Sequence, residues 1–161
     1  MKKSICSIIT FCLLTIQFSS VSQNNTEHII QQLKAKPKDP ELLNRLSEMT
    51  RTSASTTSDS LATLALKHAK TQKRKNEEIK AAVNIYNAAW ENNNFPRVIT
   101  FAELASELFL STGNYTEAAN ALNDAALASY EIDQYENALR NYRKSVNILI
   151  KTSDYKNLPS V

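Results

Sequence analysis

Two histidines are the side chains in this sequence best suited to acid-base or metal chemistry, and they stand far apart. His28 lies near the start of the chain, and His68 follows forty residues later. His68 falls at a small-residue contact of a predicted helix, so we expect it to pack against its neighbours rather than act as a ligand or a base. We expect His28 to lie on the surface.

Acidic residues recur at the predicted helix starts, as at Glu41, Asp59, Glu77 and Glu136. A carboxylate at this position interacts favourably with the positive end of the helix dipole. No two of these residues have a spacing that suggests a general acid and a general base, and the chain has no glycine-rich phosphate loop. We therefore predict that the protein is not an enzyme, has no catalytic or metal-ligating residues, and needs no cofactor.

The first 23 residues have the features of a secretory signal peptide. Lys2 and Lys3 precede an apolar run of about 14 residues at 5–18, and small residues follow at 20–22. The apolar run is shorter than the roughly 20 residues that a membrane-spanning helix needs. We expect cleavage of this segment before Gln23 or nearby; the alternative is an uncleaved membrane anchor.

Both cysteines, Cys6 and Cys12, lie inside this segment, so the exported chain is expected to have no disulfide or thiolate metal site. Without Lys2 and Lys3, the formal charge of +3 falls to about +1. Nucleic acid is therefore not an expected partner. We interpret the basic cluster at 67–80 as a solvated helix end, because Glu77 and Glu78 interrupt it.

The sequence repeats itself with a period of about 40 residues, which is typical of stacked helical arrays. "NNNFPRVITFAELASELFL" at 92–110 has the same outline as "DQYENALRNYRKSVNILI" at 133–150, and "TGNYTEA" at 112–118 aligns with "TSDYKNL" at 152–158. Apolar spacing then predicts helices at 26–36, 41–51, 59–72, 77–92, 96–111, 116–131 and 136–151.

Turn-forming residues separate these helices. We expect turns around Pro37 and Pro40, at 53–58, at 92–94, at Gly113-Asn114 and at Asp133-Gln134. Pro96 then stands in the first turn of a helix, where its missing N–H is not needed. With a single glycine and four prolines, the chain has little of the turn punctuation of a sheet protein, which favours an all-helical fold.

The pattern within the helix pairs resembles the tetratricopeptide repeat (TPR) family. One pair carries it at Leu122, Ala125, Ala126, Tyr135, Ala138, Tyr142 and Ser145, and the preceding pair at Ala82, Ile85, Tyr86, Phe95, Val98, Ala102 and Ala105. Tyr86 and Ala126 stand where the family often has glycine, and Asp133 replaces its turn glycine. The resemblance implies an all-α, right-handed α-solenoid of stacked antiparallel helix pairs, whose aromatics fill the wedge between pairs. We expect a signal peptide at 1–23, a leader or capping helix at 24–40, and about three TPR-like pairs plus the start of a fourth at 41–161.

In such arrays the first helix of each pair lines the concave face, which implies a protein or peptide ligand. Asparagine amides can pair with a peptide backbone, and apolar side chains can anchor it. The family's clamp for terminal carboxylates needs a lysine where Val83 stands, so that ligand is not expected. The concave-face candidates are Lys80, Val83, Asn84, Asn87 and Trp90, followed by Asn120, Asn123, Asp124, Leu127 and Tyr130.

A signal peptide before TPR-like pairs resembles the periplasmic part of bacterial sensor kinases and membrane-tethered regulators. We therefore predict an exported interaction module on the periplasmic or extracellular side of a bacterial envelope, as the N-terminal sensing region of a longer signalling protein. A membrane tether would then come only from sequence beyond residue 161. The alternative is a self-contained secreted scaffold. The apolar edges of the last predicted helix, 136–151, predict self-association through that helix.

Overall fold

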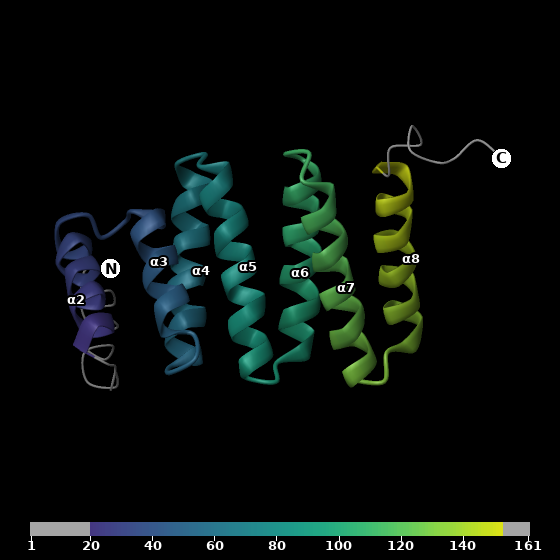
Figure 1. The fold of residues 1–161 in the computed structure, drawn as a ribbon, viewed down its shortest axis with the longest axis horizontal. Helices are drawn as coiled ribbons and strands as arrows, with labels where there is room; N and C mark the ends of the chain where they lie inside the picture. The colour runs from purple at the N-terminus through teal and green to yellow at the C-terminus, as the bar shows by residue number, and fades with distance from the viewer. Residues whose placement is uncertain (1–19, 153–161) are drawn as a thin grey trace. The chain divides into compact units, whose positions relative to one another are not determined.

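Seven helices make up the part of the chain that the structure describes. The computed structural model describes residues 20–152, and within that range every regular element is an α-helix (Figure 1). The all-helical prediction is therefore confirmed for this range. The helices are α2 (Ser20–Ala35), α3 (Pro40–Thr50), α4 (Ser55–Thr71), α5 (Lys75–Glu91), α6 (Phe95–Leu110), α7 (Tyr115–Glu131) and α8 (Tyr135–Thr152).

These helices fall into two compact units that divide between Asn94 and Phe95. The first unit holds α2 to α5 and the second holds α6 to α8. The predicted pairing of 77–92 with 96–111 crosses this division, so it stays a prediction. The predicted signal peptide lies mostly outside the described residues. Residues 153–158, which align with 113–118 in the sequence repeat, also lie outside them.

Four of the turns between helices share one geometry and recur at a constant interval. Lys73, Asn93, Gly113 and Asp133 each have a positive φ, between 53° and 77°. At each turn the amide of this residue donates to the carbonyl three residues back, and the next amide donates to the carbonyl five residues back. This is the Schellman ending of a helix. Each sequence repeat thus consists of two units of equal length, each made of one helix and the turn after it. Of the four residues with positive φ, only Gly113 is a glycine.

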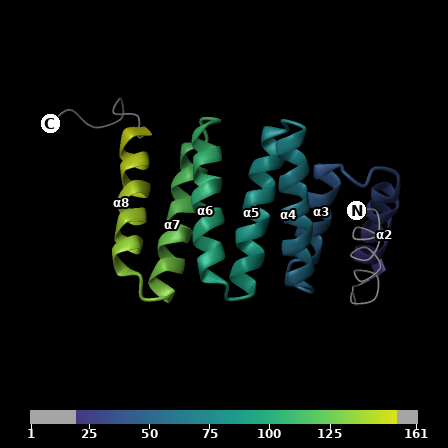
Figure 2. The same cartoon turned by 180° about the vertical axis from the view of Figure 1, so that it is seen from behind.

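The first unit is built around α4, which packs against α3 on one side and α5 on the other (Figure 2). Helix α3 also contacts α5, and α2 packs on α3. Leu43, Leu46, Leu61 and Ile85 are almost completely buried in this unit. Helix α2 contributes Ile29, Ile30 and Leu33, which are also buried.

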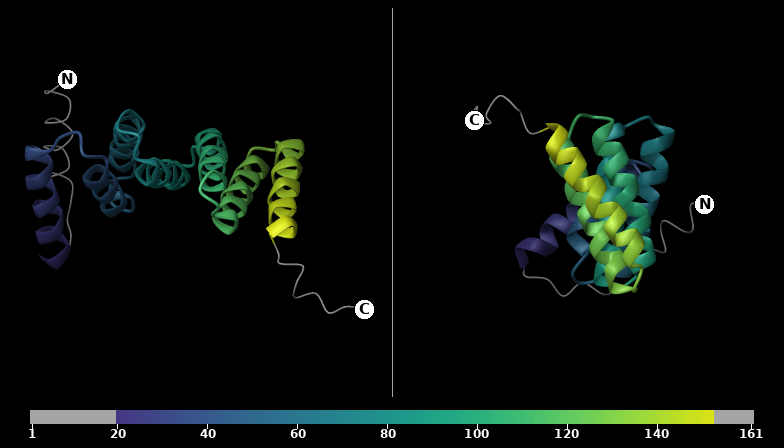
Figure 3. Two further views of the ribbon diagram at one scale, coloured as in Figure 1. Left: turned by 90° about the horizontal axis from the view of Figure 1, so that it is seen from above. Right: turned by 90° about the vertical axis from the view of Figure 1, so that its right-hand side faces the viewer.

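The second unit is built around α7, which lies between α6 and α8 (Figure 3). Small side chains let helix backbones approach closely, and α7 is dominated by them. The Oγ atom of Ser145 on α8 donates to the carbonyl of Ala119 on α7 at 2.8 Å, which shows how near the two backbones lie. The buried alanines of α7 are Ala118, Ala119, Ala121, Ala125, Ala126 and Ala128.

The start of α4 differs from the sequence-based expectation. We expected a turn at 53–58 and a helix from 59, but the helix begins at Ser55. The reason is a contact with α3: the Ser58 hydroxyl donates to the carbonyl of Ser47 at 2.8 Å, and both serines are buried. Asp59 consequently does not lie in the first turn of its helix, whereas Glu41, Glu77 and Glu136 do.

The remaining helix boundaries agree with the sequence pattern to within a few residues, except that α2 begins six residues before the predicted start at 26. Pro96 lies in the first turn of α6, and the three asparagines before Phe95 form the preceding turn, as expected. His68 is buried on α4, and His28 is exposed and hydrogen-bonded to Gln32 at 3.1 Å.

Candidate binding surfaces

A stripe of four side chains runs along one face of α5 in the first unit. Lys80, Val83, Asn87 and Trp90 are spaced by three, four and three residues, so they follow one another along that face. Lys80 and Trp90 are exposed, and Val83 and Asn87 are half-buried. We call these four residues the α5 stripe. It places a cation at one end, an amide in the middle and an indole at the other end.

Asn84 does not belong to this surface, although the sequence suggested it as a contact residue. Its side chain is 9% exposed. Its amide nitrogen donates to the backbone carbonyl of Asn44 on α3 at 3.2 Å. Asn84 therefore joins two helices of the first unit, and we leave it out of the candidate surface.

A second stripe runs along α7 in the other unit, with the same spacing and one sequence repeat later. Asn120, Asn123, Leu127 and Tyr130 are all exposed. We call these residues the α7 stripe. Asp124 is half-buried beside it. The two stripes belong to separate units, so each is described alone.

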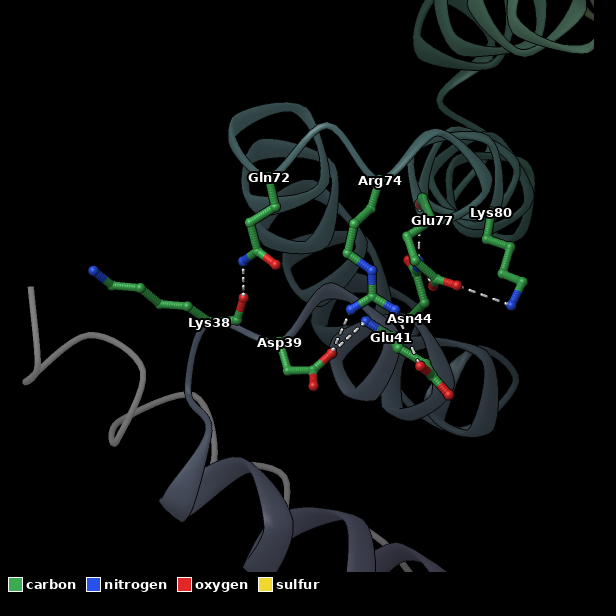
Figure 4. Close-up of polar contacts among 8 residues, drawn as sticks. All are labelled: Lys38, Asp39, Glu41, Asn44, Gln72, Arg74, Glu77 and Lys80. Atoms are coloured by element: carbon green, nitrogen blue, oxygen red, sulfur yellow. Dashed lines mark hydrogen bonds and ion pairs between the residues drawn. The ribbon is translucent and has the colours of Figure 1, made fainter. Parts of the chain in front are cut away.

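A buried polar network holds the cation of the α5 stripe in place (Figure 4). The Nζ atom of Lys80 lies 3.1 Å from Oε1 of Glu77, and the Glu77 side chain is only 8% exposed. The other carboxylate oxygen of Glu77 accepts from the Asn44 amide at 2.9 Å, and the Glu77 carbonyl accepts from the same nitrogen. Because the Lys80 side chain is 60% exposed, its ammonium remains accessible to a ligand while Glu77 fixes its position.

Arg74 joins the turn between α4 and α5 to the start of α3 (Figure 4). Its guanidinium lies 3.2 Å from Oδ1 of Asp39 and 3.1 Å from Oε2 of Glu41. Burial alone would lower the pKa of Arg74, but the bond to Glu41 and the charge of Asp39 raise it overall. Asp39 also accepts from the amide of Glu41, which caps α3. These contacts are structural, and they orient α3 and α5 within the first unit.

An aromatic pair stands at the turn between α7 and α8. The rings of Tyr130 and Tyr135 meet edge to face with centroids 5.5 Å apart. The Tyr135 hydroxyl donates to Oδ1 of Asp133 at 2.6 Å, and this bond raises the pKa of Tyr135. We expected Tyr135 to fill a wedge between helix pairs, but its side chain is 54% exposed. The ring instead extends the α7 stripe beyond Tyr130.

Sequence reasoning did not find the network around Glu77. From the sequence, Glu77 is a carboxylate at a helix start that interacts with the helix dipole, and nothing there singles out Asn44. Asn44 and Asn84 do stand one sequence repeat apart, which was the one signal that could have connected them. Residues 20–152 contain no group of three or more His, Cys, Asp or Glu side chains placed to hold a metal ion.

A scan of protein-family models found no match to this chain, and a search of curated proteins found no significant relative. None of the helices in the described range has the length and apolar character needed to cross a membrane.

Proposed function

We propose that this chain is a TPR-like helical-repeat module whose α5 stripe and α7 stripe each bind a protein or peptide segment. The observation that carries the proposal is that one exposed helix face recurs in the next sequence repeat, with an aromatic at its C-terminal end each time. Recurrent faces of this kind are how repeat proteins present a binding surface. The proposal also includes two expectations from the sequence: the helices form a right-handed solenoid, and the protein is exported.

The chemistry of the stripes fits an extended peptide. Asn87, Asn120 and Asn123 offer amide groups that can donate to and accept from a peptide backbone. Trp90 and Tyr130 are rigid aromatics that can bury a large area against a ligand at a small entropic cost. The ammonium of Lys80, held by Glu77, favours an acidic side chain near one end of the α5 stripe.

A displayed library of random peptides supplies a probe for this proposal. Peptides selected on the wild-type chain should bind the double variant Asn87→Ala, Asn123→Ala at least tenfold more weakly, with the helical circular dichroism unchanged. The matched control is Asn76→Ala with Asn147→Ala, because these asparagines are exposed on α5 and α8 but lie outside the stripes. Equal affinity for the stripe variant, or a loss in the control, would place the ligand elsewhere.

We further propose that the module serves as the sensing region of a longer bacterial signalling protein. The basis is the sequence order of a signal-peptide-like segment before the helical repeat. The reading frame after codon 161 tests this: a span of about 20 apolar residues followed by a signalling domain supports the sensor. A frame without these features favours the self-contained secreted scaffold.

A further inference from the structure

A short connection between α2 and α3, residues 36–39, is fastened to the end of α4 by two contacts (Figure 4). The amide nitrogen of the Gln72 side chain, just after α4, donates to the backbone carbonyl of Lys38 at 2.8 Å. In the following turn, the guanidinium of Arg74 lies 3.2 Å from Oδ1 of Asp39. We call these two contacts the clasp. The clasp ties the segment that carries α2 to the end of α4.

His68 lies one helical turn before Gln72, on the same face of α4. The backbone amide of Gln72 donates to the His68 carbonyl at 2.9 Å, and this helical spacing makes the two side chains neighbours. His68 is 7% exposed, and its imidazole makes no hydrogen bond within residues 20–152. A charged group that is buried without a partner is unfavourable. The site therefore accommodates the neutral imidazole and disfavours the protonated one.

The charges around His68 add to this effect. Burial lowers the pKa of His68 most, followed by the charge of Lys38 on the connection and that of Lys67 on α4. The carboxylates that the connection, α3 and α5 place at this end of the first unit lie next to other cations. These pairs are Asp39 and Glu41 with Arg74, Glu77 with Lys80, and Glu78 with Lys75, while the cations Lys36, Lys70 and Lys73 are exposed.

We propose that the clasp is sensitive to acid: a proton on His68 opens the connection from α4 and loosens α2, while α3, α4 and α5 stay packed. Opening admits water to the imidazole and moves Lys38 away from it. Helices α3 to α5 keep apolar residues of their own in the core, such as Leu43, Leu61 and Ile85. This inference does not depend on the proposed function, because it does not involve the stripes.

The opening equilibrium should depend on pH through His68. In the open state the imidazole lies in water, so its pKa returns to about 6.5. In the closed state burial and the two lysines hold the pKa of His68 below that value. The open state therefore binds the proton more readily, and opening should increase as the pH falls below 6.5, by at most about tenfold per pH unit.

Hydrogen exchange at pH 7.5 and pH 5.0 tests the proposal, once each rate is corrected for the pH dependence of intrinsic exchange. The amides of Leu33, Lys36 and Asp39 should lose at least threefold in protection at pH 5.0, whereas those of Ile85 and Ala88 in α5 should change by less than 1.5-fold. An equal loss in α5 would mean that acid unfolds the whole unit, and no loss in the first group would mean that the clasp stays closed. Either result would overturn the proposal.

Histidine variants assign the response. His68→Gln should abolish the loss of protection at pH 5.0, whereas His28→Gln, at the exposed histidine of α2, should retain it. Gln72→Ala removes one contact of the clasp, so it should reduce the protection of Lys36 and Asp39 by the same factor at both pH values. A response that survives in His68→Gln, or disappears in His28→Gln, would refute the role of His68.

Lysine variants keep the test decisive if His68→Gln folds poorly. Lys38→Gln removes a positive charge that acts on His68, so NMR titration of the His68 ring should give a higher pKa than in the wild type. The loss of protection at pH 5.0 should shrink accordingly. Lys34→Gln, at an exposed lysine in the last turn of α2, should leave both measurements unchanged. The same His68 pKa in all three proteins, or a full acid response in Lys38→Gln, would contradict the electrostatic account.

Discussion

Replacing Asn44 with alanine should destabilise the first unit strongly, because one amide group joins two helices there. The Asn44 nitrogen donates to both the carbonyl and the carboxylate of Glu77, each at 2.9 Å, and the Asn44 side chain is 2% exposed. A hydrogen bond to a charged group contributes about 1.5 to 3 kcal/mol and a neutral one about 1 kcal/mol. The variant also removes the buried Oδ1 atom, which has no partner within the described residues.

Removing that acceptor offsets part of the loss, so we expect the free energy of unfolding to fall by about 2 to 3 kcal/mol. Asn84→Ala removes a single neutral bond to the Asn44 carbonyl and should cost about 1 kcal/mol. Asn76→Ala, at an exposed position one residue before Glu77, is the matched control and should change the stability by less than about 0.5 kcal/mol.

Urea denaturation followed by tryptophan fluorescence measures these changes locally. Trp90 is the only tryptophan of the chain and belongs to the first unit, so its emission reports the unfolding of that unit. Circular dichroism then follows the helices of both units. If Asn44→Ala shifts the fluorescence transition no more than Asn76→Ala does, the contact between Asn44 and Glu77 makes no net contribution, and our account of the network is wrong.

Two further predictions concern the turns and a buried histidine. Lys73→Gly should raise the free energy of unfolding by about 0.5 to 1 kcal/mol, since a left-handed conformation is strained for lysine and free for glycine. Gly113→Ala at φ 77° should lower it by about 1 kcal/mol, and urea midpoints that move in the opposite directions would contradict the turn assignment. Burial, then the charges of Lys38 and Lys67, lower the pKa of His68 below 6.5, so the unfolded chain binds this proton more readily. The His68 contribution to stability is therefore complete above pH 6.5 and is lost as the pH falls below it, and His68→Gln should remove that part of the pH dependence of the urea midpoint.

The helices of this protein could be located from the sequence because their signals are local. Apolar spacing placed all seven within the described range, Pro96 marked the start of a helix, and Gly113 marked a turn where the structure has one. The register of the TPR resemblance also selected candidate contact residues, and Lys80, Trp90, Asn120, Asn123, Leu127 and Tyr130 among them are exposed. The helix and turn signals depend on residues within one or two helical turns of each other.

The tertiary structure decided the features that depend on which helices meet. Ser55 to Ser58 look like a turn, yet they extend α4 because Ser58 meets Ser47 across the α3 interface. Asn84 looks like a surface amide, yet it faces α3.

Glu77 illustrates the same division between sequence and structure. Its place at a helix start follows from the local pattern, whereas its burial requires the amide that α3 brings from 33 residues away. Lys80 acquires its fixed position only through that carboxylate. Such contacts are set by the packing of one helix surface into another, and periodicity within a single helix carries no information about them.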